Sequence, residues 1–359
     1  MIEDWLERKQ VCICAGSGGV GKTTASAAIA LGMAARGRKV AVVTIDPAQR
    51  LANALGLREL GNDERRVDAP VEGELWAMML DAKRTFDELI EWHAPDERTR
   101  DAVLENRIYQ ELSNAVAGSQ EYMAMEKLYE LSNEGRYDLI VLDTPPSRNA
   151  LDFLDAPRRL SEFIDSRSLQ LLTMPGRVGL RVLGRGTGMA FSVMQRATGI
   201  DLLRDLGEFF RAFGDMTDGF RERAGRVNEL LGQRTTSFVL VTSPRREAID
   251  EGIWFHRRLK DAGLPFSGVI ANRVATSTGR ARRAELIEQV GDDLAGRVLD
   301  SYDAARRLAE RDQANLDLLR RRLGRTPLLE VPYLEDDVHD LDGLRRMDEY
   351  LFGAGAREP

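Results

Sequence analysis

The stretch from Val11 to Thr24 constrains the fold more than any other part of the chain. It reads V-C-I-C-A-G-S-G-G-V-G-K-T-T, and the residues after it, A-S-A-A-I-A-L-G-M-A-A-R, favour a helix. Because glycines have no side chain, the backbone can curl until successive N–H groups face one anion, and the first helical turn adds its unpaired N–H groups. The stretch therefore predicts a buried strand, a phosphate-binding loop and a helix.

The spacing within this loop distinguishes two kinds of nucleotide site. From Gly16 through Lys22 and Thr23 it satisfies G-x-x-x-x-G-K-[ST], in which the lysine reaches the outer phosphates and the hydroxyl binds Mg²⁺. The same glycines satisfy G-x-G-x-x-G, and Asp46 lies about where a ribose-binding acid would fall. A dinucleotide site has no use for Lys22 and Thr23 together, and Pro47 directly after the acid favours a loop. The phosphate loop is therefore the favoured interpretation.

Composition excludes several classes of protein. The chain has 359 residues, 43% of them hydrophobic and 30% charged, which is typical of a globular protein with a large core. A net charge of −7 argues against general nucleic-acid binding, so no nucleic-acid partner is predicted. The two cysteines, Cys12 and Cys14, lie in the first strand, where they are expected to be core residues. With no leader and no long apolar segment, we expect a cytoplasmic location.

Strand and helix patterns alternate along the rest of the chain, which predicts an α/β fold with a mostly parallel P-loop sheet flanked by helices. The expected later strands are Lys39 to Ile45, Leu75 to Leu80, Tyr137 to Leu142, Ser237 to Thr242, Phe266 to Val274 and Pro327 to Val331. The expected helical segments are Asp81 to Glu134, Ala281 to Leu323 and Leu341 to Phe352. Arginine pairs within Ala281 to Leu323 favour a solvated, salt-bridged face over phosphate contacts, because acids are interspersed.

Two carboxylates follow buried strands, at the sheet edge where open α/β folds bind ligands. Asp143 ends the strand Tyr137 to Leu142, and in a phosphate-loop site such an acid holds Mg²⁺, usually through water. Strand-end capping is its structural alternative. Asp46 ends the second strand, and its alternative role is as N-cap of a helix from Ala48 to Leu55.

A change in composition predicts a helical insertion subdomain at 158–231, between a first core part at 1–157, which includes the helical segment 81–134, and a second core part at 232–359. An apolar stripe at helical spacing runs through Leu202, Leu203, Leu206, Phe209, Phe210, Phe213, Met216 and Phe220. Packing within a core is the favoured interpretation of this stripe. The alternatives are an adaptable groove for a client helix and, less favoured because the polar face is rich in acids, a membrane-surface anchor.

Three motifs together resemble the ArsA family, which comprises the arsenite-pump ATPase and the guided-entry ATPase that delivers tail-anchored membrane proteins. They are the loop from Gly16 to Thr24, the Asp46-Pro-Ala segment leading into R-L-A-N-A-L-G-L, and D-T-P-P-S-R-N-A at 143–150 followed by L-D-F-L. The resemblance spans nearly the whole chain, because A-N-R-V around Asn272 and V-P-Y-L from Val331 also match later motifs.

The resemblance implies a nucleotide-gated dimer that uses ATP and Mg²⁺. The phosphates would be bound by Gly18, Gly19, Val20, Gly21, Lys22, Thr23 and Thr24. Thr23 and Asp143 would serve the metal, and Asp46 would orient or activate the attacking water, so that Lys22 and Asp46 are the catalytic residues. Asn272 would recognise adenine, with Pro332 beside the base. The segments 46–55 and 143–151 would be switches that pass the nucleotide state to the helical insertion.

The chain departs from the family pattern at two points. Many members carry a second lysine before the double glycine, which reaches the partner's phosphates, but this chain has Ser17 there. The dimer is therefore predicted to be either a homodimer or a heterodimer with a paralogous ATPase subunit that supplies the lysine, and a low-turnover nucleotide-binding subunit is one alternative function. The chain also lacks the interface CxxC of the guided-entry branch, so zinc is not predicted.

The resemblance leaves the cargo open. The favoured function is an ATPase whose cycle opens and closes around a hydrophobic client helix or a membrane protein partner. The second is an ATPase subunit that energises the transport of an arsenite-like anion, which the lack of cysteines after Cys14 disfavours. A septum-positioning or DNA-segregating ATPase is less favoured still, because the tail G-A-G-A-R-E-P offers no amphipathic or basic contact.

Overall fold

The computed structural model describes residues 1–46, 48–107, 109–110, 119–144, 209, 212, 216–276, 282–334 and 337–353. The chain forms two compact units. The first contains Met1–Met79, Glu130–Leu151 and Leu231–Pro359, and the second contains Leu80–Tyr129 and Asp152–Leu230.

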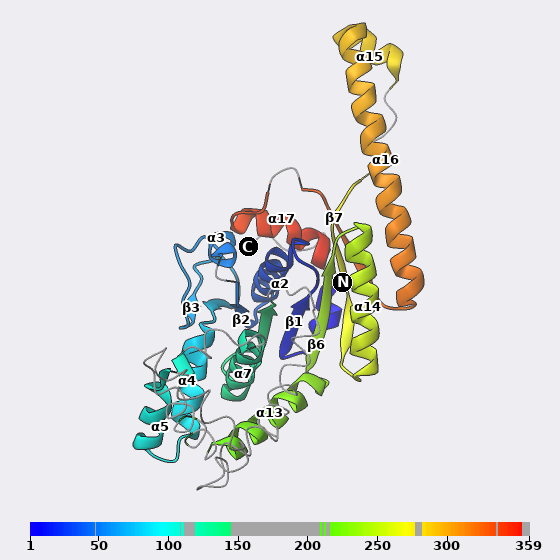
Figure 1. Cartoon of the computed structure of the whole chain (residues 1–359). Coiled ribbons are helices and arrows are strands. Elements are labelled where there is room, and N and C mark those ends of the chain that lie inside the picture. The colour runs from blue at the N-terminus through cyan, green and yellow to red at the C-terminus, as the bar shows by residue number, and fades with distance from the viewer. Residues whose placement is uncertain are drawn as a thin grey trace, which may run out of the picture. The chain divides into compact units, whose positions relative to one another are not determined.

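An eight-stranded sheet forms the centre of the first unit (Figure 1). In chain order the strands are β1 (Val11–Ala15), β2 (Lys39–Thr44), β3 (Arg65–Arg66), β4 (Glu74–Met79), β5 (Leu139–Asp143), β6 (Thr236–Thr242), β7 (Phe266–Val274) and β8 (Leu328–Pro332). Their order across the sheet is β3-β4-β2-β5-β1-β6-β7-β8, and every neighbouring pair is parallel except β3 with β4. The predicted α/β fold with a mostly parallel sheet is therefore confirmed.

The central strands are apolar because the sheet is covered on both faces. Every residue of β1, β5 and β6 is buried, and Cys12 and Cys14 are buried free thiols of the core. The register sets Asp143 beside Cys14 on one neighbouring strand and beside Thr44 on the other. The carboxyl ends of β1, β2 and β5 therefore meet at one point of the sheet edge.

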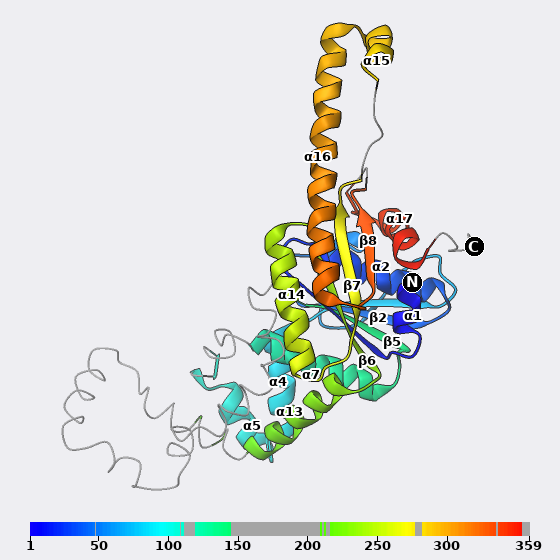
Figure 2. The same ribbon diagram turned by 90° about the vertical axis from the view of Figure 1, so that its right-hand side faces the viewer.

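The helices of the first unit are α1 (Ile2–Leu6), α2 (Lys22–Ala35), α3 (Arg50–Ala54), α14 (Arg246–Asp261), α15 (Arg283–Val290), α16 (Asp292–Leu323) and α17 (Leu341–Phe352). The helices α2 and α17 pack against each other, and Figure 2 shows α14 and α16 on the opposite side of β7 from α17. Gly32 permits this close packing, because a Cβ there would lie 2.1 Å from Oδ1 of Asp348.

The longest of the described helices, α16, has 32 residues and projects beyond the sheet, and α15 lies at its far end (Figures 1 and 2). Gly291, with φ of 79°, separates the two helices, which together confirm the helical segment predicted from Ala281 to Leu323. Within α16 the buried residues are Ala295 and then, after a stretch with no buried residue, Ala309 and four more toward the C-terminus.

The described part of the second unit is helical. Its helices are α4 (Ala82–His93), α5 (Glu97–Leu104), most of α7 (Ser119–Glu134) and most of α13 (Thr217–Gly232). Phe209, Met216 and Phe220 of the predicted apolar stripe are buried, whereas Leu202, Leu203, Leu206, Phe210 and Phe213 lie outside the described residues. Beside them, the buried Arg223 donates to the Glu126 carboxylate at 2.7 Å.

The observed elements differ from the expected ones mainly at their ends. β5 begins two residues later than expected and includes Asp143, while β3 and α1 have no counterpart among the predicted elements. The division into units places Leu80–Tyr129 with Asp152–Leu230, whereas the predicted domains assigned 81–134 to the first core part. Among the helices that the structure describes, none is both long and apolar enough to cross a bilayer.

Candidate functional site

The glycine-rich loop joins β1 to α2 through backbone conformations that require glycine. Gly16 has φ of 152°, and a Cβ there would lie 2.0 Å from the carbonyl oxygen of Val241. Gly21 has φ of 92° and is the N-cap of α2, so the helix begins at Lys22. The loop therefore ends at a helix N-terminus whose first N–H groups are available to an anion.

Lys22 is folded back over this loop. Its Nζ donates to the carbonyl oxygens of Gly16 and Ser17, both at 2.9 Å, and the side chain is buried. Burial lowers the pKa of this ammonium group, while the negative charges of Asp143 and Asp46 raise it in part. The Lys22 ammonium group could therefore contact a phosphate bound by the loop without any movement of α2.

Asp143 is the buried acid of the site. Its Oδ2 accepts hydrogen bonds from the hydroxyls of Thr23, at 2.7 Å, and Thr44, at 2.9 Å, whereas its buried Oδ1 has no partner among the described residues. Burial raises the pKa of Asp143 to about 6, although both hydroxyls and Lys22 oppose this shift. A buried carboxylate oxygen without a partner, next to a threonine hydroxyl, fits the ligand set of a Mg²⁺ ion that keeps several waters.

Asp46 lies at the end of β2 and forms a local turn. Its Oδ1 accepts from the N–H of Ala48 at 2.9 Å, and Oδ2 lies 3.5 Å from the Arg50 guanidinium. The N-cap of α3 is Gln49, with φ of 57°, so the alternative role of Asp46 as a helix N-cap is wrong. Asp46 is part of the cavity wall instead.

Two cavities adjoin the loop. One, of about 380 Å³, is lined by Gly19, Gly21, Lys22, Thr23, Thr24, Asp46, Arg50, Asn53, Ala54, Thr144, Arg273, Val338 and His339. The other, of about 890 Å³, lies between the residues Ser17 to Val20 of the loop, the start of α14, and Arg273, Leu308, Arg311, Asp312, Asn315 and Tyr333. The structure thus brings together all the loop residues predicted from the sequence, with Asp46 and Asp143 at the same sheet edge.

The two residues assigned to the base lie on the neighbouring strands β7 and β8. Asn272 braces the loop: its Nδ2 donates to the carbonyl of Val20 and its Oδ1 accepts from the N–H of Arg273, each at 3.0 Å. Because an amide has two N–H groups and two oxygen lone pairs, it keeps one donor and one acceptor position for a base.

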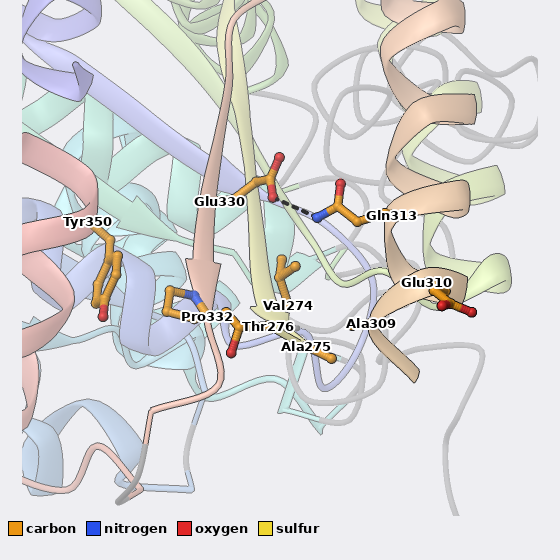
Figure 3. A pocket seen from close by; sticks show the side chains of 9 residues that line it. All are labelled: Val274, Ala275, Thr276, Ala309, Glu310, Gln313, Glu330, Pro332 and Tyr350. Carbon is orange, nitrogen blue, oxygen red and sulfur yellow. Dashed lines mark hydrogen bonds between the residues drawn. The ribbon is translucent and has the colours of Figure 1, made fainter. Parts of the chain in front are cut away.

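Pro332 lines a third cavity, of about 510 Å³, which Asn272 does not line. This cavity is largely apolar, with Val274, Ala275 and Tyr350 in its wall, and at its edge Gln313 donates to the Glu330 carboxylate at 3.3 Å (Figure 3).

Two polar contacts of the loop were not predicted from the sequence. The Ser17 hydroxyl donates to the Glu251 carboxylate of α14, and the Arg273 guanidinium donates to the carbonyl of Gly19 at 3.4 Å. Glu251 is 234 residues from Ser17, so no local pattern links them. For Arg273 the only signal in the sequence is a charged residue near the end of an apolar strand.

Comparisons with known proteins agree with this arrangement. A family model described as Anion-transporting ATPase, the ArsA ATPases, matches residues 9–353. A protein named ATPase GET3 from Malassezia globosa is 30% identical over 98% of this chain and 93% of its own length. Another ATPase GET3, from Podospora anserina, is 24% identical over 94% of this chain and 88% of its own length. A putative arsenical pump-driving ATPase from Aquifex aeolicus is 23% identical over 96% of this chain and 79% of its own length.

The family match covers nearly the whole chain, and the loop, the buried Asp143 and the parallel sheet are where a P-loop ATPase needs them. The protein is therefore a member of the ArsA family of ATPases.

Proposed function

We propose that this protein is a Mg²⁺-dependent, dimeric switch ATPase whose nucleotide state controls the binding of a hydrophobic client helix or a membrane protein. The observation that carries the proposal is the buried Asp143, which is bonded to Thr23 of the loop and to Thr44 through one oxygen and has an unpartnered second oxygen.

In this proposal the loop from Gly18 to Thr24 holds the phosphates of ATP through its backbone N–H groups, and Lys22 moves from its carbonyl contacts to the outer phosphates. Thr23 and Asp143 would hold Mg²⁺, and the bound ion would neutralise charge on the transferred phosphoryl group. The protein contributes positioning and charge stabilisation, which supply most of the catalysis of phosphoryl transfer.

Asp46 orients the attacking water. Its carboxylate lies in the wall of the same cavity as Lys22 and Thr23, and the hydrogen bond from Ala48 fixes its orientation. Asn272 contacts adenine through the donor and acceptor that it does not use to brace the loop, and Pro332 packs beside the base. Pro332 is the weaker of these two assignments, because the cavity that it lines includes no residue of the loop, whereas Asn272 is bonded to Val20.

One observation supports a switch. The two expected switch segments, 46–55 and 143–151, both begin at the phosphate cavity, which Asp46 and Thr144 line. Order imposed on such segments by a γ-phosphate is a common way to pass nucleotide state to a distant part of a protein. The resemblance to the guided-entry ATPases supports a hydrophobic client for the helical unit and, with it, a cytoplasmic location.

The experiment measures mass in solution and client capture in the same samples. Purified protein, with Mg²⁺ and ATP, ADP or no nucleotide, is sized by light scattering and mixed with a peptide that contains one transmembrane helix and a photo-crosslinker. We expect ATP to cause dimerisation and crosslinking of the peptide in the wild type. In Lys22→Ala, we expect ATP to change neither the mass nor the crosslinking. If the mass of the wild-type protein and its crosslinking to the peptide are the same with ATP, with ADP and without nucleotide, the proposed switch is contradicted.

A transport function is the second candidate, since one relative is named an arsenical pump-driving ATPase. It predicts that arsenite raises ATP turnover several-fold. Absence of any effect of arsenite, together with ATP-dependent capture of the peptide, would favour the client function.

The identity of the partner subunit is tested by turnover of the isolated chain. If a paralogous subunit supplies the lysine that Ser17 replaces, the chain alone hydrolyses ATP slowly and Ser17→Lys raises turnover. Full activity of the isolated protein with no gain from the substitution would favour a homodimer that does not need this lysine.

A further inference from the structure

Arg273 has a backbone conformation that its residue type disfavours. It is the penultimate residue of β7, with φ of 60°, and among the described residues Gln49 is the one other non-glycine residue with positive φ. This region is unfavourable for a non-glycine residue, which adopts it only where the surrounding structure imposes it. Such positions cluster at ligand sites, so the conformation of Arg273 suggests that its side chain has a role in binding a ligand.

The conformation directs the Arg273 side chain to the nucleotide loop. Its backbone N–H is held by Oδ1 of Asn272, and Nη1 lies 3.4 Å from the carbonyl oxygen of Gly19. Arg273 lines both cavities that adjoin the loop, and no other basic residue lines both. Its guanidinium therefore contacts the loop that would hold the phosphates.

The positive charge of Arg273 also has no counter-ion among the described residues. Arg50, Arg246 and Arg311, which line the same cavities, each lie within ion-pair distance of an acid, namely Asp46, Asp250 and Asp312. For Arg273 the described part of the chain provides no carboxylate within 4.0 Å. Its one side-chain contact is a neutral carbonyl, which a phosphate oxygen outcompetes because it is charged.

The usual second lysine of the loop, which would add positive charge at the phosphates, is absent from this chain. Position 17 carries a serine whose hydroxyl is engaged by Glu251, so it adds no positive charge to the phosphates. The other lysine or arginine residues in the wall of the smaller cavity are Lys22 and Arg50, and Arg50 lies within ion-pair distance of Asp46.

We propose that Arg273 binds the outermost phosphate of the nucleotide within its own subunit and supplies the positive charge that Ser17 does not. The proposal rests on the ATPase function proposed above. No covalent bond is made or broken by the arginine: its guanidinium exchanges the carbonyl of Gly19 for phosphate oxygens, and two of its N–H groups suit two oxygens of one phosphate.

The test uses three variants of the full chain. Arg273→Gly removes the guanidinium but keeps the positive φ without strain, so a loss in this variant reports on the side chain rather than on the backbone. Arg273→Lys keeps the charge without the planar fork. Arg257→Ala is the matched control, because Arg257 is an exposed arginine of α14 that lines neither cavity.

We expect Arg273→Gly to lower kcat/KM for MgATP by about 100-fold, the usual effect of one charge-stabilising donor. Arg273→Lys recovers about a tenth of the lost activity, and Arg257→Ala matches the wild type. Affinity for a non-hydrolysable ATP analogue falls at least ten-fold in Arg273→Gly, whereas affinity for ADP, which lacks the outermost phosphate, changes less than three-fold.

Turnover of Arg273→Gly within two-fold of the wild type would overturn this proposal alone, provided that Lys22→Ala abolishes turnover in the same assay. Equal losses of ATP-analogue and ADP affinity would also overturn it, since they indicate support of the loop through Gly19. If the wild type neither binds nor hydrolyses ATP, the proposed function and the role of Arg273 both fail.

Discussion

The helices α2 and α16 belong to the same unit and differ in how much of their surface is buried. Eleven of the 14 residues of α2 are buried, and five of these are alanines. Six of the 32 residues of α16 are buried, while Leu294 and Tyr302 of its projecting part are 43% and 38% exposed. One helix is held along its whole length, and the other is held mainly at its C-terminal half.

This difference shows where the molecule needs rigidity. The first turn of α2 carries Lys22 and Thr23, so packing of α2 against β1, β2, β5 and α17 fixes the phosphate-binding groups. The projecting part of α16 packs mainly on α15 and has few buried contacts. Segments with few buried apolar contacts open at low free energy, so α16 is expected to be locally unstable at its N-terminal half.

The largest effect is expected within α16 itself. Leu316→Ala removes a fully buried side chain and should lower the free energy of unfolding by about 3 kcal/mol, whereas Leu294→Ala should change it by less than about 1 kcal/mol. Urea denaturation of both variants measures the difference. Equal losses would show that the projecting half of α16 is packed as well as the other half.

The contact between α2 and α17 is expected to depend on pH. Burial raises the pKa of Asp348 to about 6, and the Arg36 guanidinium, 3.7 Å away, opposes this only in part. The folded protein thus retains a proton that the unfolded chain loses near pH 4. The free energy of unfolding should therefore fall, by up to about 3 kcal/mol, as pH rises from about 4 to about 6.

Asp348→Asn should remove this part of the pH dependence without weakening the fold at pH 7. Unfolding of wild type and variant across pH 4 to 7 provides the measurement. An unchanged slope in the variant would mean that Asp348 is ionised in the folded protein throughout that range.

The same substitution should have opposite effects in the two helices. Gly32→Ala in α2 places a methyl group against Asp348 and the Phe352 ring and should destabilise the protein by about 2 kcal/mol, despite the better helix propensity of alanine. Gly296→Ala in α16 meets nothing within 4 Å and should stabilise by about 0.5 to 1 kcal/mol. Calorimetry measures the stability of both variants. A Gly32→Ala protein that is more stable than the wild type would contradict the tight packing of α2.

Much of this contrast could be predicted from the sequence, because the signals were local. The run from Val11 to Thr24 predicts β1, the loop and α2 by itself, and charges interspersed with apolar residues between 281 and 323 predict a solvated helical segment. Asp143 could also be predicted, because a strand that ends in an acid, paired with a phosphate loop, is a strong signal.

The remaining parts of the site depend on contacts between residues far apart in the chain. The backbone conformation of Arg273 and the engagement of Ser17 by Glu251 are set by tertiary packing, which leaves no local pattern. The resemblance placed Pro332 beside the base, but Pro332 lines a cavity that no residue of the loop lines, although β8 pairs with the end of β7 that follows Asn272.

The most direct test of the proposed ATPase site is steady-state hydrolysis of ATP by the purified chain with and without Mg²⁺, compared with Lys22→Ala and Asp143→Asn. We expect turnover that requires Mg²⁺ and falls at least 100-fold in each variant, because each substitution removes a charge at the phosphates or their metal. Turnover that persists in Lys22→Ala would contradict the assignment of the loop as the site of hydrolysis.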